Sequence, residues 1–293
     1  MKGVGCRVWG VAFATVLSAA MGCGRGGDRI VIGSKNFTEQ DILGEVVAQQ
    51  LERSGFAVER RFHLAGTFVC HQALVARQID AYVEYTGTAL VAILKDSSGV
   101  TDADTALARV RAAYGARFAA EWLAPLGFNN TFAMIVRSGD TTGVRTLTQA
   151  ARRARPWRAG FGYEFMERAD GFAGLQRIYG LPLAGPPRIM DLGLTYRALA
   201  DSQVDLIAGN STDGQIEALH LVTLEDDRHY FPPYQAAIVV RAESLRRHPG
   251  ARAALEALAG RIGNATMRRM NYFVDVEHRD VATVAREFLA TVR

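Results

Sequence analysis

Cysteine is scarce in this chain, with three thiols among 293 residues. Cys6 lies in an apolar amino-terminal segment and Cys23 directly follows that segment, which leaves Cys70 as the one cysteine of the remaining sequence. A single thiol excludes an internal disulfide framework. Cys70 is followed by His71, but adjacent side chains on a helix or strand point in different directions. The sequence therefore predicts a buried structural cysteine at Cys70 and no Cys/His nucleophile pair.

Motifs for catalysis are also missing from the sequence. There is no zinc-type His-Glu spacing, no Gly-x-Ser-x-Gly turn and no glycine-rich phosphate loop. The histidines are scattered along the chain, at His63, His71, His220, His229, His248 and His278. We therefore expect a protein that is not an enzyme and that uses no cofactor and no metal.

An excess of positive charge is likewise absent. The formal net charge is +4, and residues 1–22 contain two bases, Lys2 and Arg7, and no acid, so the rest of the chain carries +2. A charge this small does not make a phosphate-binding face, and no signature of a nucleic-acid-binding domain occurs. We expect no nucleic-acid partner.

Long hydrophobic runs are confined to the amino terminus. The segment from Val8 to Ala20 is apolar but too short to span a bilayer as a stable helix, and it follows the basic residues Lys2 and Arg7. This pattern predicts an export signal over residues 1–22. No later run reaches transmembrane length.

The end of that signal resembles the cleavage box of bacterial lipoproteins, in which small residues precede a cysteine. The stretch reads Ala19-Ala20-Met21-Gly22-Cys23, and residues 23–28 then form a glycine-rich tether. Two acyl chains on Cys23 would hold the protein at a membrane surface. We expect a lipid-anchored protein on the outer face of the cytoplasmic membrane. The alternative is an ordinary secretory signal followed by an incidental cysteine.

Short apolar strands alternate with amphipathic helices along the rest of the chain. Ile30 to Gly33 reads as a strand, and Thr38 to Asp41 as the capping box of a helix that ends near Gly55. Further strands are expected at 58–62, 79–83, 133–136, 159–161, 204–207, 221–224 and 234–240. Further helices are expected at 72–78, 104–118 and 194–200, and another is expected after Gly171. Three helices are expected after residue 240, the last of them at 280–293. The pattern predicts an α/β fold with parallel sheets.

The strand and helix pattern restarts near residue 131 and again near residue 235. We expect two α/β lobes joined by two crossover segments. Lobe 1 comprises 29–130 plus 235–293, and lobe 2 comprises 131–234. The crossovers fall near Phe128–Thr131 and near Phe231–Pro233, where two prolines stiffen the second.

Two motifs place chemistry at strand ends. Gly33–Gln40 and Tyr82–Thr88 each join a strand to a helix and bring aromatic rings, hydroxyls and a lysine to the sheet edge, where open α/β folds bind small ligands. These motifs and several later ones match, in order and spacing, the substrate-binding proteins of quaternary-amine ABC importers, which the chain resembles from about Arg29 onward. The matching segments are 33–40, 84–90, 129–133, 168–171, 190–196, 211–214 and 231–234.

The resemblance implies a ligand-binding site built from aromatic rings and cations. The family's carboxylate-binding group corresponds in this chain to Lys35, Thr88 and Arg168. The family's aromatic box, which holds a methylated ammonium, corresponds to Tyr85, Phe132 and Tyr234. Phe132 replaces a tyrosine that the family often has. A trimethylammonium has no N–H to donate, so ring faces are what can hold its charge.

The box lacks one ring, because Asn210 stands where many relatives have a tyrosine. The resemblance therefore leaves two possibilities open. Asn210 enlarges the site for a bulkier betaine, such as carnitine or the histidine-derived betaine ergothioneine, or another tyrosine fills the gap. The candidate tyrosines are Tyr82, Tyr163, Tyr196 and Tyr230.

Some of these residues also have an interpretation without any role in ligand binding. Lys35 could be a solvated loop lysine, although the chain has only three lysines, Lys2, Lys35 and Lys95, against abundant arginine. Tyr85, Phe132 and Tyr234 could be core aromatics.

The resemblance as a whole implies a monomeric solute-binding lipoprotein with the periplasmic-binding-protein fold, in which two α/β lobes form a hinged clamp. It would capture glycine betaine, choline, carnitine or a related compound and deliver it to an ABC permease and its ATPase. A lipid-anchored sensor that reports the ligand without transporting it is the alternative.

Overall fold

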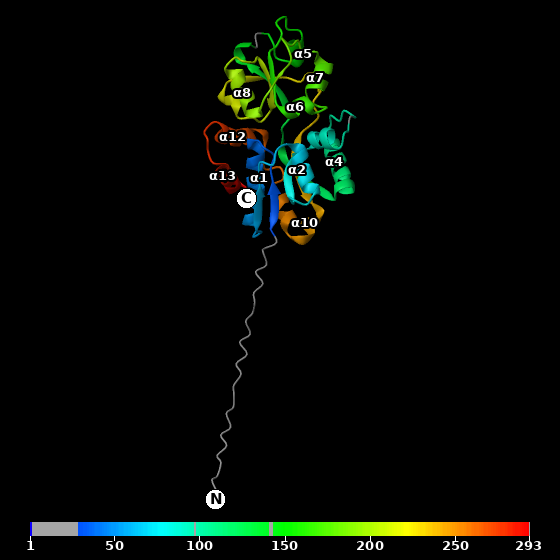
Figure 1. Cartoon of the computed structure of the whole chain (residues 1–293), viewed down its shortest axis with the longest axis vertical. Coiled ribbons are helices and arrows are strands. Elements are labelled where there is room, and N and C mark those ends of the chain that lie inside the picture. The colour runs from blue at the N-terminus through cyan, green and yellow to red at the C-terminus, as the bar shows by residue number, and fades with distance from the viewer. Residues whose placement is uncertain (2–28, 97, 141–142, 293) are drawn as a thin grey trace.

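The computed structural model describes residue 1, residues 29–96, 98–140 and 143–292. The predicted signal, the tether and the lipidation site at Cys23 lie outside these residues. Within them, no helix combines the length and the apolar character needed to cross a bilayer. The described chain forms two α/β bodies that lie one above the other in Figure 1.

The first sheet has the strand order β2-β1-β3-β10-β4. Strand β1 runs parallel to β2 and β3, whereas β10 lies antiparallel to β3 and β4. The strands are β1 (Ile30–Gly33), β2 (Val58–Arg61), β3 (Ala81–Tyr85), β4 (Ala120–Asn129) and β10 (Gln235–Arg241). The helices of this body are α1 (Thr38–Arg53), α2 (Thr67–Val75), α3 (Thr86–Thr88) continued by a π-helical turn (Ala89–Ile93), α4 (Ala103–Phe118), α10 (Ala242–Arg247), α11 (Ala251–Glu256), α12 (Asn264–Asp275) and α13 (Val281–Thr291).

The second sheet has the strand order β7-β6-β8-β5-β9. Here β6 is parallel to β7 and β8, and β5 is antiparallel to β8 and β9. The strands are β5 (Phe132–Arg137), β6 (Ala159–Phe161), β7 (Arg188–Ile189), β8 (Leu206–Asn210) and β9 (Leu221–Leu224), and a 3-10 turn covers Ser138–Asp140. The helices are α5 (Leu147–Ala151), α6 (Tyr163–Glu167), α7 (Phe172–Tyr179), α8 (Leu192–Ala200) and α9 (Gln215–Ala218).

Two segments connect the bodies: residues 130–131, between β4 and β5, and residues 225–234, between β9 and β10 (Figure 1). They are joined to one another, because the Asn130 N–H donates to the Tyr234 carbonyl over 3.0 Å. The strands of each sheet fall within the ranges expected for lobes 1 and 2. The boundaries of the lobes themselves stay a prediction.

The α/β fold of the periplasmic-binding-protein type is confirmed, but four expectations about its elements are wrong. The sheets are mixed, not parallel, because β10 and β5 pair antiparallel with their neighbours. Strands β4 and β7 and helices α3, α5, α6 and α9 were not expected. Four helices, not three, follow β10 among the described residues. The capping box at Thr38 is absent, because Phe37 is the N-cap and the Thr38 hydroxyl donates to Asp275.

Cys70 is buried in the first body, as predicted, with no exposed surface. Its thiol donates to the Ser34 carbonyl over 3.4 Å. Burial raises the pKa of the Cys70 thiol to about 12, so the reactive thiolate is suppressed. His71 is buried too and packs edge-on against Tyr114 and Phe118. Both residues belong to the core.

Candidate functional site

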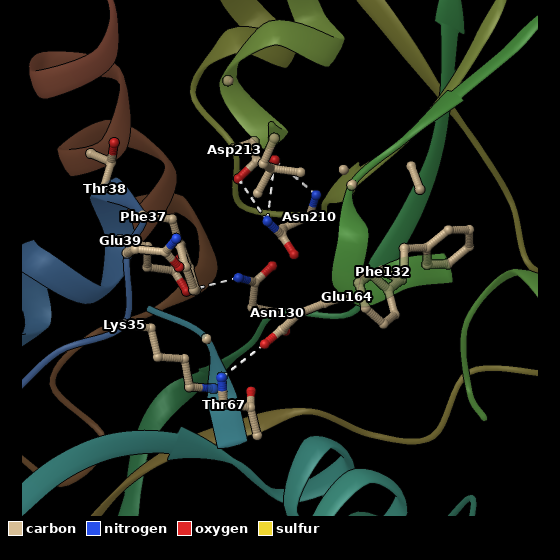
Figure 2. Close-up of a pocket in the computed structure, with 18 of the residues that line it drawn as sticks. Lys35, Phe37, Thr38, Glu39, Thr67, Asn130, Phe132, Glu164, Asn210 and Asp213 are labelled. Atoms are coloured by element: carbon tan, nitrogen blue, oxygen red, sulfur yellow. Dashed lines mark hydrogen bonds between the residues drawn. The ribbon is translucent and has the colours of Figure 1, made fainter. Parts of the chain in front are cut away.

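A cavity of about 780 Å³ lies between the two bodies, next to the crossover segments. The first body contributes the segment after β1, the starts of α1 and α2 and the end of β3, and the second body contributes α6, the start of β5 and the end of β8. All seven residues singled out from the sequence line this cavity: Lys35, Tyr85, Thr88, Phe132, Arg168, Asn210 and Tyr234. Figure 2 shows Lys35, Phe132 and Asn210 around it. That they bind a ligand stays a prediction.

Aromatic faces and protein cations already meet in this cavity. The Phe132 and Tyr234 ring centroids are 5.8 Å apart in an edge-to-face arrangement. The Arg168 guanidinium lies 5.0 Å from the Phe132 centroid, and the Lys35 ammonium lies 5.0 Å from the Tyr85 centroid. The electron-rich faces of these rings are therefore placed where they stabilise positive charge.

Lys35 is not a solvated loop lysine. Its ammonium forms an ion pair with Glu84 over 2.5 Å, and both side chains are almost fully buried. Glu84 also accepts hydrogen bonds from the Tyr82 hydroxyl and the Tyr85 N–H. The charge of Lys35 is thus neutralised from within lobe 1, which the sequence did not indicate.

Arg168 is likewise paired with a buried carboxylate. Its guanidinium makes a two-pronged ion pair with Asp170 and also donates to the Thr88 hydroxyl over 3.1 Å, across the gap between the lobes. The Tyr234 hydroxyl donates to the same Asp170 carboxylate. Burial disfavours the charged guanidinium, but the Asp170 hydrogen bonds and nearby negative charges, Glu164 among them, outweigh it and raise the pKa of Arg168 above its ordinary value.

Glu39, at the start of α1, is a site residue that sequence reasoning missed. Its buried carboxylate accepts hydrogen bonds from Tyr85 (2.6 Å), Asn130 (2.8 Å), Thr212 (2.5 Å) and Asn271 (3.0 Å). These donors come from lobe 1, a crossover and lobe 2. Burial nevertheless raises the pKa of Glu39, because no cation lies among the groups that contact it. Its position within the Gly33–Gln40 motif was the available signal.

Asn210 is oriented by Asp213. The Asn210 backbone N–H donates to Asp213 over 2.8 Å and its side-chain amide over 3.3 and 3.4 Å, while the Tyr196 hydroxyl donates over 2.6 Å. The side-chain carbonyl oxygen of Asn210 therefore points away from Asp213, into the cavity (Figure 2). This position offers an acceptor to a ligand, not a ring. Burial raises the pKa of Asp213 to about 7.

Two of the four tyrosines considered as replacements for the missing ring line the cavity. They are Tyr163, which is exposed, and Tyr196, whose hydroxyl is held by Asp213. Tyr82 lies in the core of lobe 1, and the Tyr230 hydroxyl donates to the backbone carbonyls of Ala169 and Gly171. Neither Tyr82 nor Tyr230 lines the cavity.

Carboxylates outnumber cations around the cavity. The two cations Lys35 and Arg168 are already paired with Glu84 and Asp170, which lie behind the lining. The carboxylates that line the cavity itself are Glu39, Asp41, Glu164, Glu167, Asp191, Asp213 and Asp275. Burial raises the pKa of Glu39, Asp213 and Asp275, so these three are less negative than free carboxylates. The negative field that favours a positively charged ligand therefore comes mainly from the other four. Among the residues that the structure describes, no three His, Cys, Asp or Glu side chains are grouped so that they could hold a metal ion.

Comparison with known proteins identifies similar proteins over most of the chain. Residues 28–291 match the family described as the substrate-binding domain of ABC-type glycine betaine transport systems. An ergothioneine transport permease/ergothioneine binding protein of Helicobacter pylori is 34% identical over 89% of this chain. The chain spans 47% of that relative's length.

Two further likenesses cover nearly the whole of both proteins. A carnitine transport binding protein of Listeria monocytogenes is 34% identical over 89% of this chain and 86% of its own length. A solved structure titled as a glycine betaine/carnitine/choline ABC transporter superposes with a TM-score of 0.75 at 30% identity, over 89% of this chain and 97% of the other.

Proposed function

The chain belongs to the family of substrate-binding domains of ABC-type glycine betaine transport systems, and from this premise we propose that its cavity binds a quaternary ammonium compound. The observation that supports the proposal most is that three aromatic residues, Tyr85, Phe132 and Tyr234, line one cavity whose remaining wall is rich in carboxylates. Solute binding for an ABC importer is the common activity of the family.

The proposed recognition follows from the chemistry of the ligand. A trimethylammonium group is positively charged but has no N–H, so it gains from ring faces and from a negative field and makes no use of hydrogen-bond acceptors. Each desolvated ring face contributes about 2 kcal/mol. By the resemblance, the carboxylate of a betaine would lie near Lys35, Thr88 and Arg168. Because Lys35 and Arg168 lie 5.0 Å from the Tyr85 and Phe132 ring centroids, both ends of a short betaine would lie close to the same rings.

Ligand-induced stabilisation provides the primary test. The purified mature chain is screened by thermal unfolding with glycine betaine, choline, carnitine and ergothioneine, with glutamate and lysine as controls that lack methylated nitrogen. A true ligand at a hundred times its dissociation constant adds about 2.7 kcal/mol to the free energy of unfolding. If none of the quaternary amines raises the unfolding temperature, the proposed function is wrong.

A betaine larger than glycine betaine is a second candidate. It is favoured by Asn210, which presents a carbonyl oxygen to the cavity where a ring would otherwise narrow it. The hydroxyl of carnitine or the ring N–H of ergothioneine could donate to this oxygen. Titration calorimetry with all four compounds separates the candidates, and tight binding of glycine betaine with no binding of larger betaines would contradict this one.

We further propose that the protein acts as a monomer anchored through lipid on Cys23 and hands its ligand to an ABC permease with an ATPase. The clamp-like fold suits this role, because two lobes can close around a ligand. Metabolic labelling with a fatty acid, compared between wild type and Cys23→Ala, tests the anchor. Loss of ligand uptake on deletion of the gene distinguishes transport from sensing.

A further inference from the structure

The amino-terminal end of α2 opens into the cavity. Helix α2 begins at Thr67, its N-cap is Gly66, and no side chain of the preceding segment caps it. The first N–H groups of a helix have no partner within the helix and attract anions. The Thr67 side chain adds a second donor: Thr67 is 1% exposed and lines the cavity, and its hydroxyl has no hydrogen-bond partner among the described residues.

The opposite lobe supplies an anion to this helix end. Glu164, on α6, accepts a hydrogen bond from the Thr67 N–H over 2.8 Å, as the dashed line in Figure 2 shows. The approach is close enough that a Cβ atom added to Gly66 would lie 2.1 Å from the same Glu164 oxygen. Glycine at position 66 thus leaves room for a carboxylate at the start of α2.

We propose that the start of α2, with the N–H and the hydroxyl of Thr67, is a carboxylate subsite of the cavity, for which Glu164 competes with the carboxylate of the ligand. This inference rests on the proposed function. It concerns which quaternary amines are bound, because it makes Glu164 a residue that discriminates between ligands with a carboxylate and ligands without one.

The competition follows from the charges around the subsite. Lys35 and Arg168 are each neutralised by a carboxylate of their own lobe. The Thr67 N–H is instead bonded to Glu164 of the other lobe, and the Thr67 hydroxyl has no hydrogen-bond partner among the described residues. A betaine carboxylate that reaches the Thr67 N–H has to displace Glu164 and then lies beside a like charge, which is unfavourable. Choline has a hydroxyl in place of the carboxylate, so Glu164 does not oppose it and its charge attracts the ammonium.

The test measures the ratio of dissociation constants of choline and glycine betaine, which share the trimethylammonium group. Calorimetry is carried out on wild type, Glu164→Ala and Glu167→Gln. Glu167 is a matched control, since it lies on the same helix and lines the same cavity. We expect Glu164→Ala to bind glycine betaine more tightly and choline no more tightly, so that the ratio shifts by about tenfold toward glycine betaine. Glu167→Gln should leave the ratio within about twofold of wild type.

A second substitution ties the effect to the helix end. Thr67→Val removes the hydroxyl and keeps the shape of the side chain, so in the Glu164→Ala background it should reverse most of the gain for glycine betaine and leave choline unchanged. An unchanged ratio in Glu164→Ala, an equal shift in Glu167→Gln, or a gain that survives Thr67→Val would overturn the subsite while leaving the proposed function intact. Failure of wild type to bind choline and glycine betaine would overturn the subsite, and failure to bind carnitine and ergothioneine as well would overturn the proposed function too.

Discussion

Replacing Asn210 with tyrosine should restore a fourth ring to the cavity. Asn210 ends β8 and lines the cavity, with its carbonyl oxygen facing inward. Its side-chain amide makes only long contacts of 3.3 and 3.4 Å with Asp213, whereas its backbone N–H and the Tyr196 hydroxyl hold Asp213 over 2.8 and 2.6 Å. The substitution therefore removes little that keeps Asp213 in place.

The expected gain is that of one aromatic face. A ring over a trimethylammonium contributes about 1–2 kcal/mol, which corresponds to a roughly five- to thirty-fold lower dissociation constant. Titration calorimetry should show this gain for glycine betaine in Asn210→Tyr and also in Asn210→Phe, because the ring face and not the hydroxyl is responsible. Betaines that use the enlarged site should bind more weakly to both variants.

Asn210→Leu is the control for this prediction, because it removes the amide and adds apolar volume without a π face. It should not improve the binding of glycine betaine. If Asn210→Leu and Asn210→Tyr change the dissociation constant equally, or if Asn210→Tyr gives no improvement, the assignment of position 210 to the aromatic box is refuted.

Three further perturbations test the same site. Tyr85→Ala should weaken quaternary-amine binding by at least about tenfold, while Tyr85→Phe, which keeps the ring, should stay within about threefold; equal losses in calorimetry would remove the ring face from the account. Lys35→Met should lower the free energy of unfolding by about 3–5 kcal/mol, because it leaves Glu84 charged, buried and unpaired, and adding Glu84→Gln should recover most of the loss in urea titrations. Burial raises the pKa of Asp213 from 3.8 to about 7, so the native state keeps a proton that the unfolded state has lost and stability falls as pH rises through that window. The unfolding temperature of Asp213→Asn should therefore rise relative to wild type between about pH 4 and pH 7, and a difference that does not vary with pH would contradict the buried carboxyl.

Local patterns were sufficient where a segment's own residues determine its structure. The strand Ile30–Gly33 and the following helix have the expected positions, because their apolar residues recur at strand and helix spacing and most of them are buried. The segments around the cavity were also identified from the sequence, through the two motifs that join a strand to a helix and through the resemblance. The hydrogen bond of Thr38 to Asp275 was not foreseeable, because the two residues lie far apart in the chain and meet only through the docking of α12.

Strand β4 shows why other elements were missed. It contains Pro125 and Gly127, which in isolation indicate a turn. In the structure the pairing with β10 is irregular at these positions, with Asn129 and Pro125 opposite Gln235 and Ala237. The extra residues of β4 accommodate the proline, and the partner strand lies more than a hundred residues later in the chain.

The charges of the site were only half visible in the sequence. Lys35 and Arg168 could be placed by motif, but a motif does not reveal that Glu84 neutralises one of them from within the core. The four donors of Glu39 likewise come from distant segments. Pairings of this kind depend on the tertiary structure, and they change the interpretation of the cavity from one with free cations to one with a negative wall.

The central claim is that the cavity holds a permanently charged methylated nitrogen by its ring faces and its negative field. Its most direct test compares choline with 3,3-dimethylbutanol, the neutral analogue in which carbon replaces the nitrogen at the same shape. The account predicts that choline binds at least about tenfold more tightly in a calorimetric titration of the wild-type protein. Equal affinity for the two compounds would contradict it.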